Sequence, residues 1–127
     1  MLRDMGILDG LMGNASQVDA KELQEELAPV LAPGERVEGA FKIVRDLIVF
    51  TDKRLVLVDK QGVSKKEFLS IPYRAITRFS VETAGTFDME AELKVWVSGT
   101  AEPLQRTFKR GSAIAEVQRM LATFALR

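Results

Sequence analysis

The sequence contains no cysteine and no histidine among its 127 residues. The absence of both residue types excludes disulfide bonds, thiolate nucleophiles, imidazole acid-base catalysis and zinc sites of the usual kind. An excess of one charge is also lacking, because 18 basic residues balance 18 acidic ones. A chain without net charge has no overall field that draws it to phosphate backbones or anionic lipid. We therefore expect no nucleic-acid partner and no membrane partner.

A targeting segment is missing as well. The first fourteen residues, MLRDMGILDGLMGN, carry three charged side chains and three glycines, so they form neither the apolar core of a signal peptide nor a membrane span. The sequence therefore predicts a cytoplasmic location. The chain is 46% hydrophobic, and 127 residues suffice for one domain with its own core.

Two short apolar runs in the middle of the chain, Leu47–Phe50 and Leu55–Val58, predict a pair of strands. Each is four residues long and is followed by turn-forming residues, whereas a buried helix needs ten or more residues. A half-buried strand alternates between apolar and polar residues, but these two runs are apolar on both faces. Their outer side must be covered, either by a helix predicted over about Gln17–Ala28 or by another subunit.

A single tryptophan, Trp96, is out of phase with the apolar residues Leu93, Val95 and Val97 of its predicted strand, so it lies on the face opposite the core. Large aromatic side chains on an outer face often mark an interface, and cover by the N-terminal helix is the alternative. The residues that we assign to a candidate oligomer interface are Ile48, Phe50, Val56, Val58 and Trp96.

Helices are predicted at both ends of the strand region. In the first, Ser16 and Asp19 form a variant capping box before an apolar stripe. In the last, Ser112 is the predicted N-cap. Alternating residues predict further strands between the helices, and in the first of them Val37 shares a face with Phe41. The total is seven short antiparallel strands, followed by an amphipathic helix with Ile114, Val117, Leu121 and Phe124 on its buried face.

Three phrases of the sequence resemble the bacterial pleckstrin-homology-like family in its short, single-domain form. They are RDLIVFTDKRLVLVDKQG (residues 45–62), SIPYRAITRFSVETAG (70–85) and FDMEAELKVW (87–96), which occur in the same order and with compatible spacing. The family pattern often has a histidine where this chain has Thr86, so no role for that histidine is transferred.

The resemblance implies a mainly β fold, a partly open barrel of seven antiparallel strands in two near-orthogonal sheets with a C-terminal helix as its cap. In this scheme the single domain consists of an N-terminal helical segment (residues 1–34), the barrel (35–110) and the capping helix (112–127). The resemblance further implies cyclic homo-oligomeric rings, five-membered for short relatives. It also implies that a hydrophilic surface near the subunit junction binds an unidentified protein partner.

Charged residues around the central hairpin are candidates for this protein-interaction surface. The alternative is that they are solvated turn residues whose surface ion pairs contribute little. The candidates are Arg45, Asp46, Asp52, Lys53, Arg54 and Asp59.

Peripheral binding of an anionic lipid headgroup is the alternative function. Pleckstrin-homology domains that bind phosphoinositides use several basic side chains on the loop between the first two strands. That connection is here about Val44–Asp46, with one arginine beside an aspartate. We also expect no enzymatic activity and no cofactor, because no serine has a histidine to activate it and no glycine-rich phosphate loop occurs.

Overall fold

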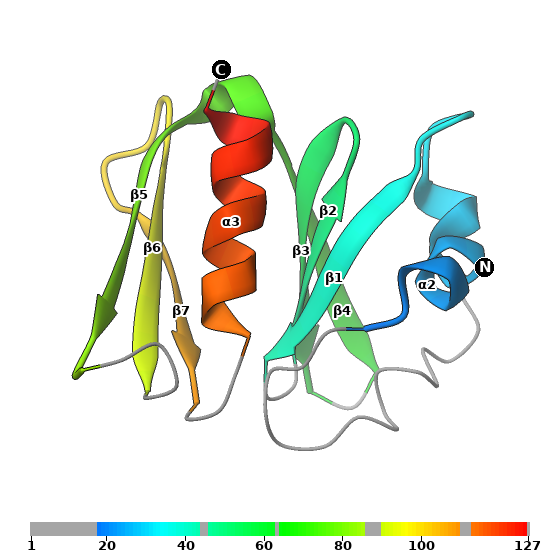
Figure 1. The fold of residues 1–127 in the computed structure, drawn as a ribbon. Helices are drawn as coiled ribbons and strands as arrows, with labels where there is room; N and C mark the ends of the chain where they lie inside the picture. The colour runs from blue at the N-terminus through cyan, green and yellow to red at the C-terminus, as the bar shows by residue number, and fades with distance from the viewer. Residues whose placement is uncertain (1–17, 44–45, 63, 86–89, 110–112, 127) are drawn as a thin grey trace.

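The computed structural model describes residues 18–43, 46–62, 64–85, 90–109 and 113–126 (Figure 1). Seven antiparallel strands and two helices confirm the predicted fold class. In chain order the elements are α2 (Ala20–Leu27), the 3-10 helix η1 (Ala28–Val30), β1 (Val37–Ile43), β2 (Asp46–Thr51), β3 (Arg54–Gln61), β4 (Lys65–Pro72), the 3-10 helix η2 (Tyr73–Ala75), β5 (Ile76–Thr83), β6 (Ala91–Val97), β7 (Leu104–Phe108) and α3 (Ile114–Ala125).

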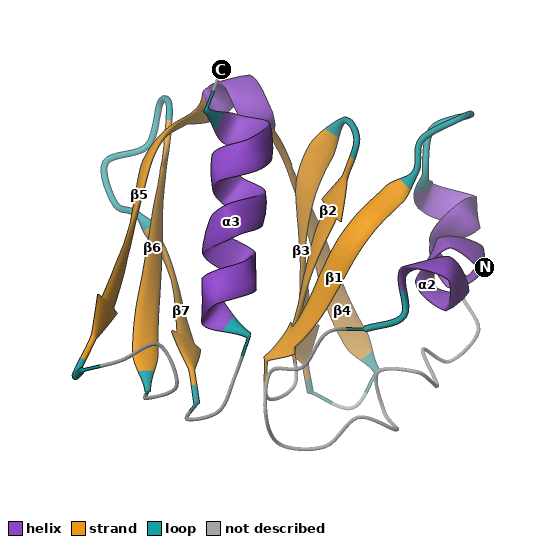
Figure 2. Cartoon of the chain, in the orientation of Figure 1, coloured by secondary structure: helices purple, strands orange, loops and turns teal. Residues whose placement is uncertain are grey.

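The strands form two sheets, which we call sheet A (order β1-β2-β3-β4) and sheet B (order β5-β6-β7). Figure 2 shows α3 standing between the two groups of strands, while α2 lies beside sheet A on the side away from sheet B. No described helix is long and apolar enough to cross a membrane.

The main core fills the space between the sheets and α3. The α3 residues Ile114, Val117 and Leu121 are buried there, as predicted from their spacing. Phe41 of β1 packs edge-on against Phe50 of β2, with ring centroids 6.1 Å apart. The helix therefore contributes one apolar stripe to a core that both sheets share.

A second core lies on the opposite face of sheet A, beneath α2. Leu23 and Leu27 of the helix are fully buried against an apolar surface of β1, β2 and β3. The sheet contributes Val37, Ala40, Leu47, Val49, Val56 and Val58 to this cluster. The central strands are thus apolar on both faces because each face packs against a different layer of the same chain.

Two local features differ from the sequence-based expectation. Helix α2 begins at Ala20 rather than Gln17, since the Asp19 carboxylate accepts hydrogen bonds from the backbone N–H groups of Lys21 and Glu22 and so caps the helix. In β1, a register shift between Val37 and Gly39 puts Val37 in the cluster beneath α2, not on the face of Phe41. A bulge inserts one extra residue, which breaks the alternation. Ser16 and Ser112, the predicted caps, lie outside the described residues.

Candidate functional site

The four aliphatic and aromatic residues predicted to form an oligomer interface are part of the interior. Ile48 and Phe50 are 1% and 0% exposed in the main core, and Val56 and Val58 are 5% and 2% exposed beneath α2. Of the two covers left open by the sequence, the helix is the one observed. These four side chains are therefore core residues of a single chain, and almost none of their surface is available to a neighbouring chain.

Trp96 lies on the outer face of sheet B, as its phase predicted. Helix α2 packs on sheet A and does not cover it. Arg78, directly opposite on β5, places its Cζ atom 4.2 Å from the centroid of the indole ring. This cation-π contact places the guanidinium over the ring, with Arg78 exposed and Trp96 half-buried on the surface of the sheet.

The rest of this outer face is polar. Ser80 is opposite Lys94, and Glu82 is opposite Glu92, one step further along the same strands. The residues between them, such as Leu93 and Val95, point into the main core. Sheet B therefore has one apolar and one hydrated face, the pattern expected of an antiparallel sheet that is packed on one side only.

A buried ionic network joins the segment before β1 to the β2–β3 hairpin. The side chain of Glu35 is 1% exposed, and Arg54 binds it in bidentate fashion, through Nε to Oε2 at 2.9 Å and Nη2 to Oε1 at 3.0 Å. The Thr51 hydroxyl donates to Oε2 at 2.6 Å, and the Ala32 backbone N–H donates to Oε1 at 2.8 Å. Arg54 is therefore a structural residue that neutralises a buried carboxylate.

The ionisation of this network follows from its contacts. Burial raises the pKa of Glu35, but the hydrogen bonds from Arg54, Thr51 and Ala32 outweigh it and lower the pKa from 4.5 to about 2. Burial raises the pKa of Tyr73 above its usual value, and its hydroxyl donates to the Thr51 carbonyl at 2.6 Å. Glu35 is thus a stable carboxylate and Tyr73 a neutral donor, and neither is poised for proton transfer near neutral pH.

The other charged candidates around the hairpin also have roles inside the chain. Asp52 accepts from the Arg36 backbone N–H at 2.8 Å, and Asp46 accepts from the Lys60 backbone N–H at 3.1 Å. Asp59 pairs with Arg106 of β7 at 3.0 Å and so links the two sheets.

Among the five described candidates only Lys53, in the β2–β3 turn, is classed as exposed; the sixth, Arg45, lies outside the described residues. Glu35 and Arg106, the partners of Arg54 and Asp59, could not be identified from the sequence because these pairs are 19 and 47 residues apart.

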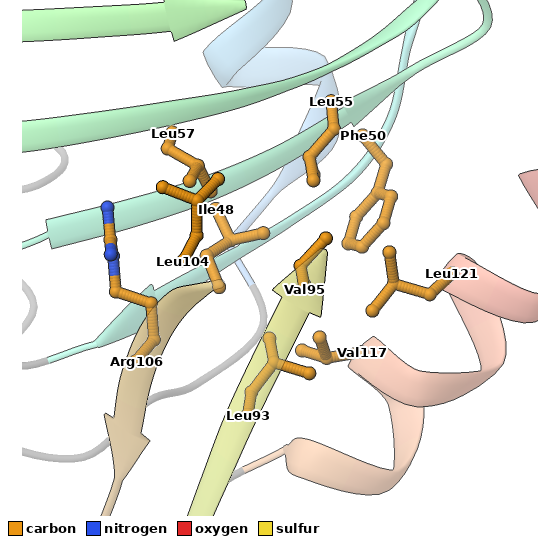
Figure 3. Close-up of a pocket in the computed structure, with 10 residues that line it drawn as sticks. All are labelled: Ile48, Phe50, Leu55, Leu57, Leu93, Val95, Leu104, Arg106, Val117 and Leu121. Carbon is orange, nitrogen blue, oxygen red and sulfur yellow. The ribbon is translucent and has the colours of Figure 1, made fainter. Parts of the chain in front are cut away.

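The interior between the sheets contains an apolar cavity, shown in Figure 3. Side chains from sheet A, sheet B and α3 line it, and Arg106 lies at one end. Its volume is about 10 Å³, which is about the space of one water molecule and too small for a cofactor. Within the described parts of the chain, no group of three or more acidic side chains is arranged to hold a metal ion.

Comparison with known proteins identifies the fold family. A family model described as bacterial PH domain matches residues 6–125. The chain belongs to the bacterial PH domain family. Two Bacillus subtilis proteins, both described as uncharacterised, resemble this PH domain over nearly their whole length. YjqA is 57% identical across 96% of this chain and 100% of its own, and YozO is 32% identical across 88% and 94%.

Solved structures give the same assignment. A pleckstrin-homology domain from Shewanella amazonensis superposes with a TM-score of 0.80 at 56% identity, covering 94% of this PH domain and 98% of that chain. A pleckstrin-homology protein from Shewanella loihica gives a TM-score of 0.79 at 49% identity, covering 90% and 99%. The family and fold expected from the three sequence phrases are therefore confirmed.

The loop that holds headgroups in phosphoinositide-binding PH domains is short in this one. Ile43, the last residue of β1, is the direct partner of Asp46, the first residue of β2, so two residues connect the strands. Of the residues next to that connection, Lys42 is buried and Asp46 is acidic. Neither adds an exposed cation beside the loop.

Proposed function

We propose that this bacterial PH domain is a non-enzymatic interaction module that assembles into a cyclic homo-oligomer and binds a protein partner in that form. The observation that carries the proposal is the pair of long edge strands. β4 and β5 are each eight residues long, and each pairs with a neighbour on one side only. An uncovered edge of this length offers a row of backbone donors and acceptors to another chain.

The positions of these two edges suit a ring. β4 ends sheet A and β5 begins sheet B, with only the three residues of η2 between them. Contact between the β4 edge of one chain and the β5 edge of the next is heterologous, since each chain contributes two different surfaces. Contacts of this kind generate closed rings when the rotation between subunits permits. The ring size of five follows from the family resemblance.

Exposed apolar side chains lie beside the β4 edge. Phe68 of β4 is 36% exposed and Val30 of η1 is 46% exposed. Arg54 links β4 to η1, because its guanidinium donates to Ser70 Oγ and to the Val30 carbonyl, each at 2.8 Å. Phe68 and Ser70 lie on the same face of β4. An apolar pair next to an open strand edge supports burial of this region against another subunit.

A partner-binding surface is supported by a hollow near the junction of β4 and β5. Lys53, Tyr73, Arg74, Phe124 and Ala125 line an opening of about 360 Å³. Lys53 and Arg74 are exposed cations, and the ring of Tyr73 stacks on that of Phe124 at 5.2 Å. We propose that this hollow receives a carboxylate side chain of the protein partner, since both cations attract it and the stacked rings supply a rigid apolar floor.

The test of assembly is the molar mass in solution. Light scattering on wild-type protein at micromolar concentration is expected to give five times the 14.1 kDa chain mass for each proposed ring, or a multiple of that value where rings associate. Phe68→Asp is expected to reduce this mass to no more than that of two chains, because a carboxylate beside the edge is costly to bury. Leu126→Asp is the matched control: Leu126 is 59% exposed at the C-cap of α3, on neither edge strand, and its substitution should leave the mass unchanged. A wild-type mass of one chain contradicts the proposal.

Flotation with anionic vesicles discriminates the lipid-binding alternative. The ring proposal expects the protein to stay unbound at every salt concentration, because the β1–β2 connection is too short to surround a headgroup. Salt-sensitive flotation that is lost in Lys53→Glu would instead favour a lipid ligand at the hollow.

A further inference from the structure

The outer face of sheet B is the large surface of this domain that no described helix covers. Its residues from Arg78 to Glu82 on β5 and from Glu92 to Trp96 on β6 alternate between the core and the outside. The outward residues occur as three cross-strand pairs, and β7 adds the uncharged Gln105 and Thr107 beside them. In order along the strands, the pairs are Arg78 with Trp96, Ser80 with Lys94, and Glu82 with Glu92.

Charge is divided along this face. Arg78 and Lys94 lie toward one end, and Glu82 and Glu92 toward the other, where Glu90 also lines a shared hollow. Arg78 and Glu82 are four residues apart on one strand, which is about 13 Å at the usual rise of a strand. The outward charges therefore form a dipole along the face, with its positive end at Trp96.

Neither end is neutralised by the described part of the chain. Among the described residues, no carboxylate forms an ion pair with Arg78 or Lys94. Arg78 instead contacts the Trp96 ring, and its side chain is exposed. At the other end, Glu82 and Glu92 are directly opposed, an arrangement that destabilises a sheet because like charges repel across the ladder.

One binding partner is complementary to both the positive and the negative end of this face. We infer that the outer face of sheet B binds the same face of a second copy of this chain, turned end for end. In that orientation Arg78 and Lys94 of one copy meet the opposed carboxylates of the other, and the contact is repeated by symmetry. An acidic protein would gain from Arg78 but would be repelled by Glu82 and Glu92, and a basic protein would meet the reverse problem. Trp96 and Arg78 are residue types that dominate the energy of such contacts.

This inference is independent of the ring. The ring uses the edges of β4 and β5, whereas this contact uses a sheet face and joins two chains of opposite orientation. Loss of one contact therefore leaves the other in place.

Charge-swapped variants test the inference. One variant, Arg78→Glu with Lys94→Glu, makes the face acidic throughout; the other, Glu82→Lys with Glu92→Lys, makes it basic throughout. By light scattering, each variant alone is expected to lose at least half of the wild-type molar mass, since like charges then face each other. An equimolar mixture of the two is expected to regain the wild-type mass. A ring that fails through its edges would not be restored by mixing.

A control variant separates this effect from net charge. Lys21→Glu with Arg119→Glu reverses two exposed cations on the helices and should retain the wild-type mass. Circular dichroism confirms that each variant is folded. The wild-type protein provides a second measurement without substitution: its mass should fall at least twofold between roughly 0.01 and 1 M salt, as screening shortens from about 30 to 3 Å. Unchanged mass in either charge-swapped variant, no recovery on mixing, or a salt-independent mass overturns the inference.

Discussion

Sheet A and sheet B differ in how their outer faces are covered. Sheet A is covered on both faces, by sheet B and α3 on one side and by α2 on the other, and its central strands are apolar throughout. Sheet B is packed on one face only and carries a charged outer surface. A strand without alternation therefore indicates a further layer, and that layer can belong to the same chain.

This difference decides where contacts with other molecules can form. On sheet A the apolar outer face is already used by α2, so only the β4 edge with Phe68 and the nearby Val30 remain partly exposed. On sheet B no described helix packs on the outer face, and its charges are arranged for a polar contact rather than an apolar one.

The largest expected effect comes from placing the same carboxylate on the outer face of each sheet. Val56→Asp puts an unpaired charge beneath α2, where the side chain is 5% exposed, and is expected to destabilise the domain by more than about 4 kcal/mol. Ser80→Asp puts it on the exposed face of sheet B opposite Lys94 and should change stability by less than about 0.5 kcal/mol. Urea denaturation measures both. Equal losses would show that the two outer faces do not differ in burial.

Removal of the cover itself is the next largest effect. Leu23→Ala deletes a fully buried side chain of α2 and is expected to cost about 2 to 5 kcal/mol, from lost burial and the cavity that remains. Leu126→Ala, the same substitution at a 59% exposed position of the chain, should cost less than about 0.5 kcal/mol. The free energies of unfolding come from chemical denaturation followed by circular dichroism. A small loss at Leu23 would mean that α2 contributes little to the stability of sheet A.

Most of the fold could be predicted from sequence because its signals are local. The apolar runs at Leu47–Phe50 and Leu55–Val58, the stripe of α3 and the outward phase of Trp96 each depend on residues within a few positions of one another. The cover of sheet A could not be decided in the same way. Leu23 and Val56 are far apart in sequence, and an amphipathic helix and a second subunit satisfy the same pattern equally well.

The candidate site was less predictable because a charge pattern does not reveal its partners. Arg54 and Asp59 look like solvated turn residues in sequence, but their partners, Glu35 and Arg106, come from the segment before β1 and from β7. The bulge at Val37 was also hidden, since nothing in the local sequence marks the extra residue. Contacts between distant segments therefore account for what could not be predicted from the sequence.

The Glu35 network makes the stability of sheet A depend on pH. It fixes the N-terminal segment that covers sheet A. Sheet B has no such buried carboxylate among its described residues. The folded pKa of Glu35 is about 2, below the value of 4.5 expected in the unfolded chain. Its contribution is therefore complete above about pH 5 and is lost as the pH falls toward 2, by about 3 kcal/mol. Glu35→Gln should lower stability at pH 7 and flatten this acid dependence. Parallel pH profiles for the two proteins would contradict the assigned role.

The smallest expected effect concerns the ion pair that joins the two sheets. Asp59 of β3 and Arg106 of β7 are 25% and 18% exposed, so solvent screens their attraction only in part. A double-mutant cycle with Asp59→Asn and Arg106→Gln is expected to give a coupling energy of about 0.5 to 1 kcal/mol, which falls at high salt. The pair Arg119 and Glu116, exposed on α3, is the matched control and should give a smaller coupling. If the coupling at Asp59 and Arg106 is no larger than in this exposed pair, the ion pair does not help to join the sheets. The sheets would then be held together by their shared apolar core alone, and they would differ in charge only on their outer faces.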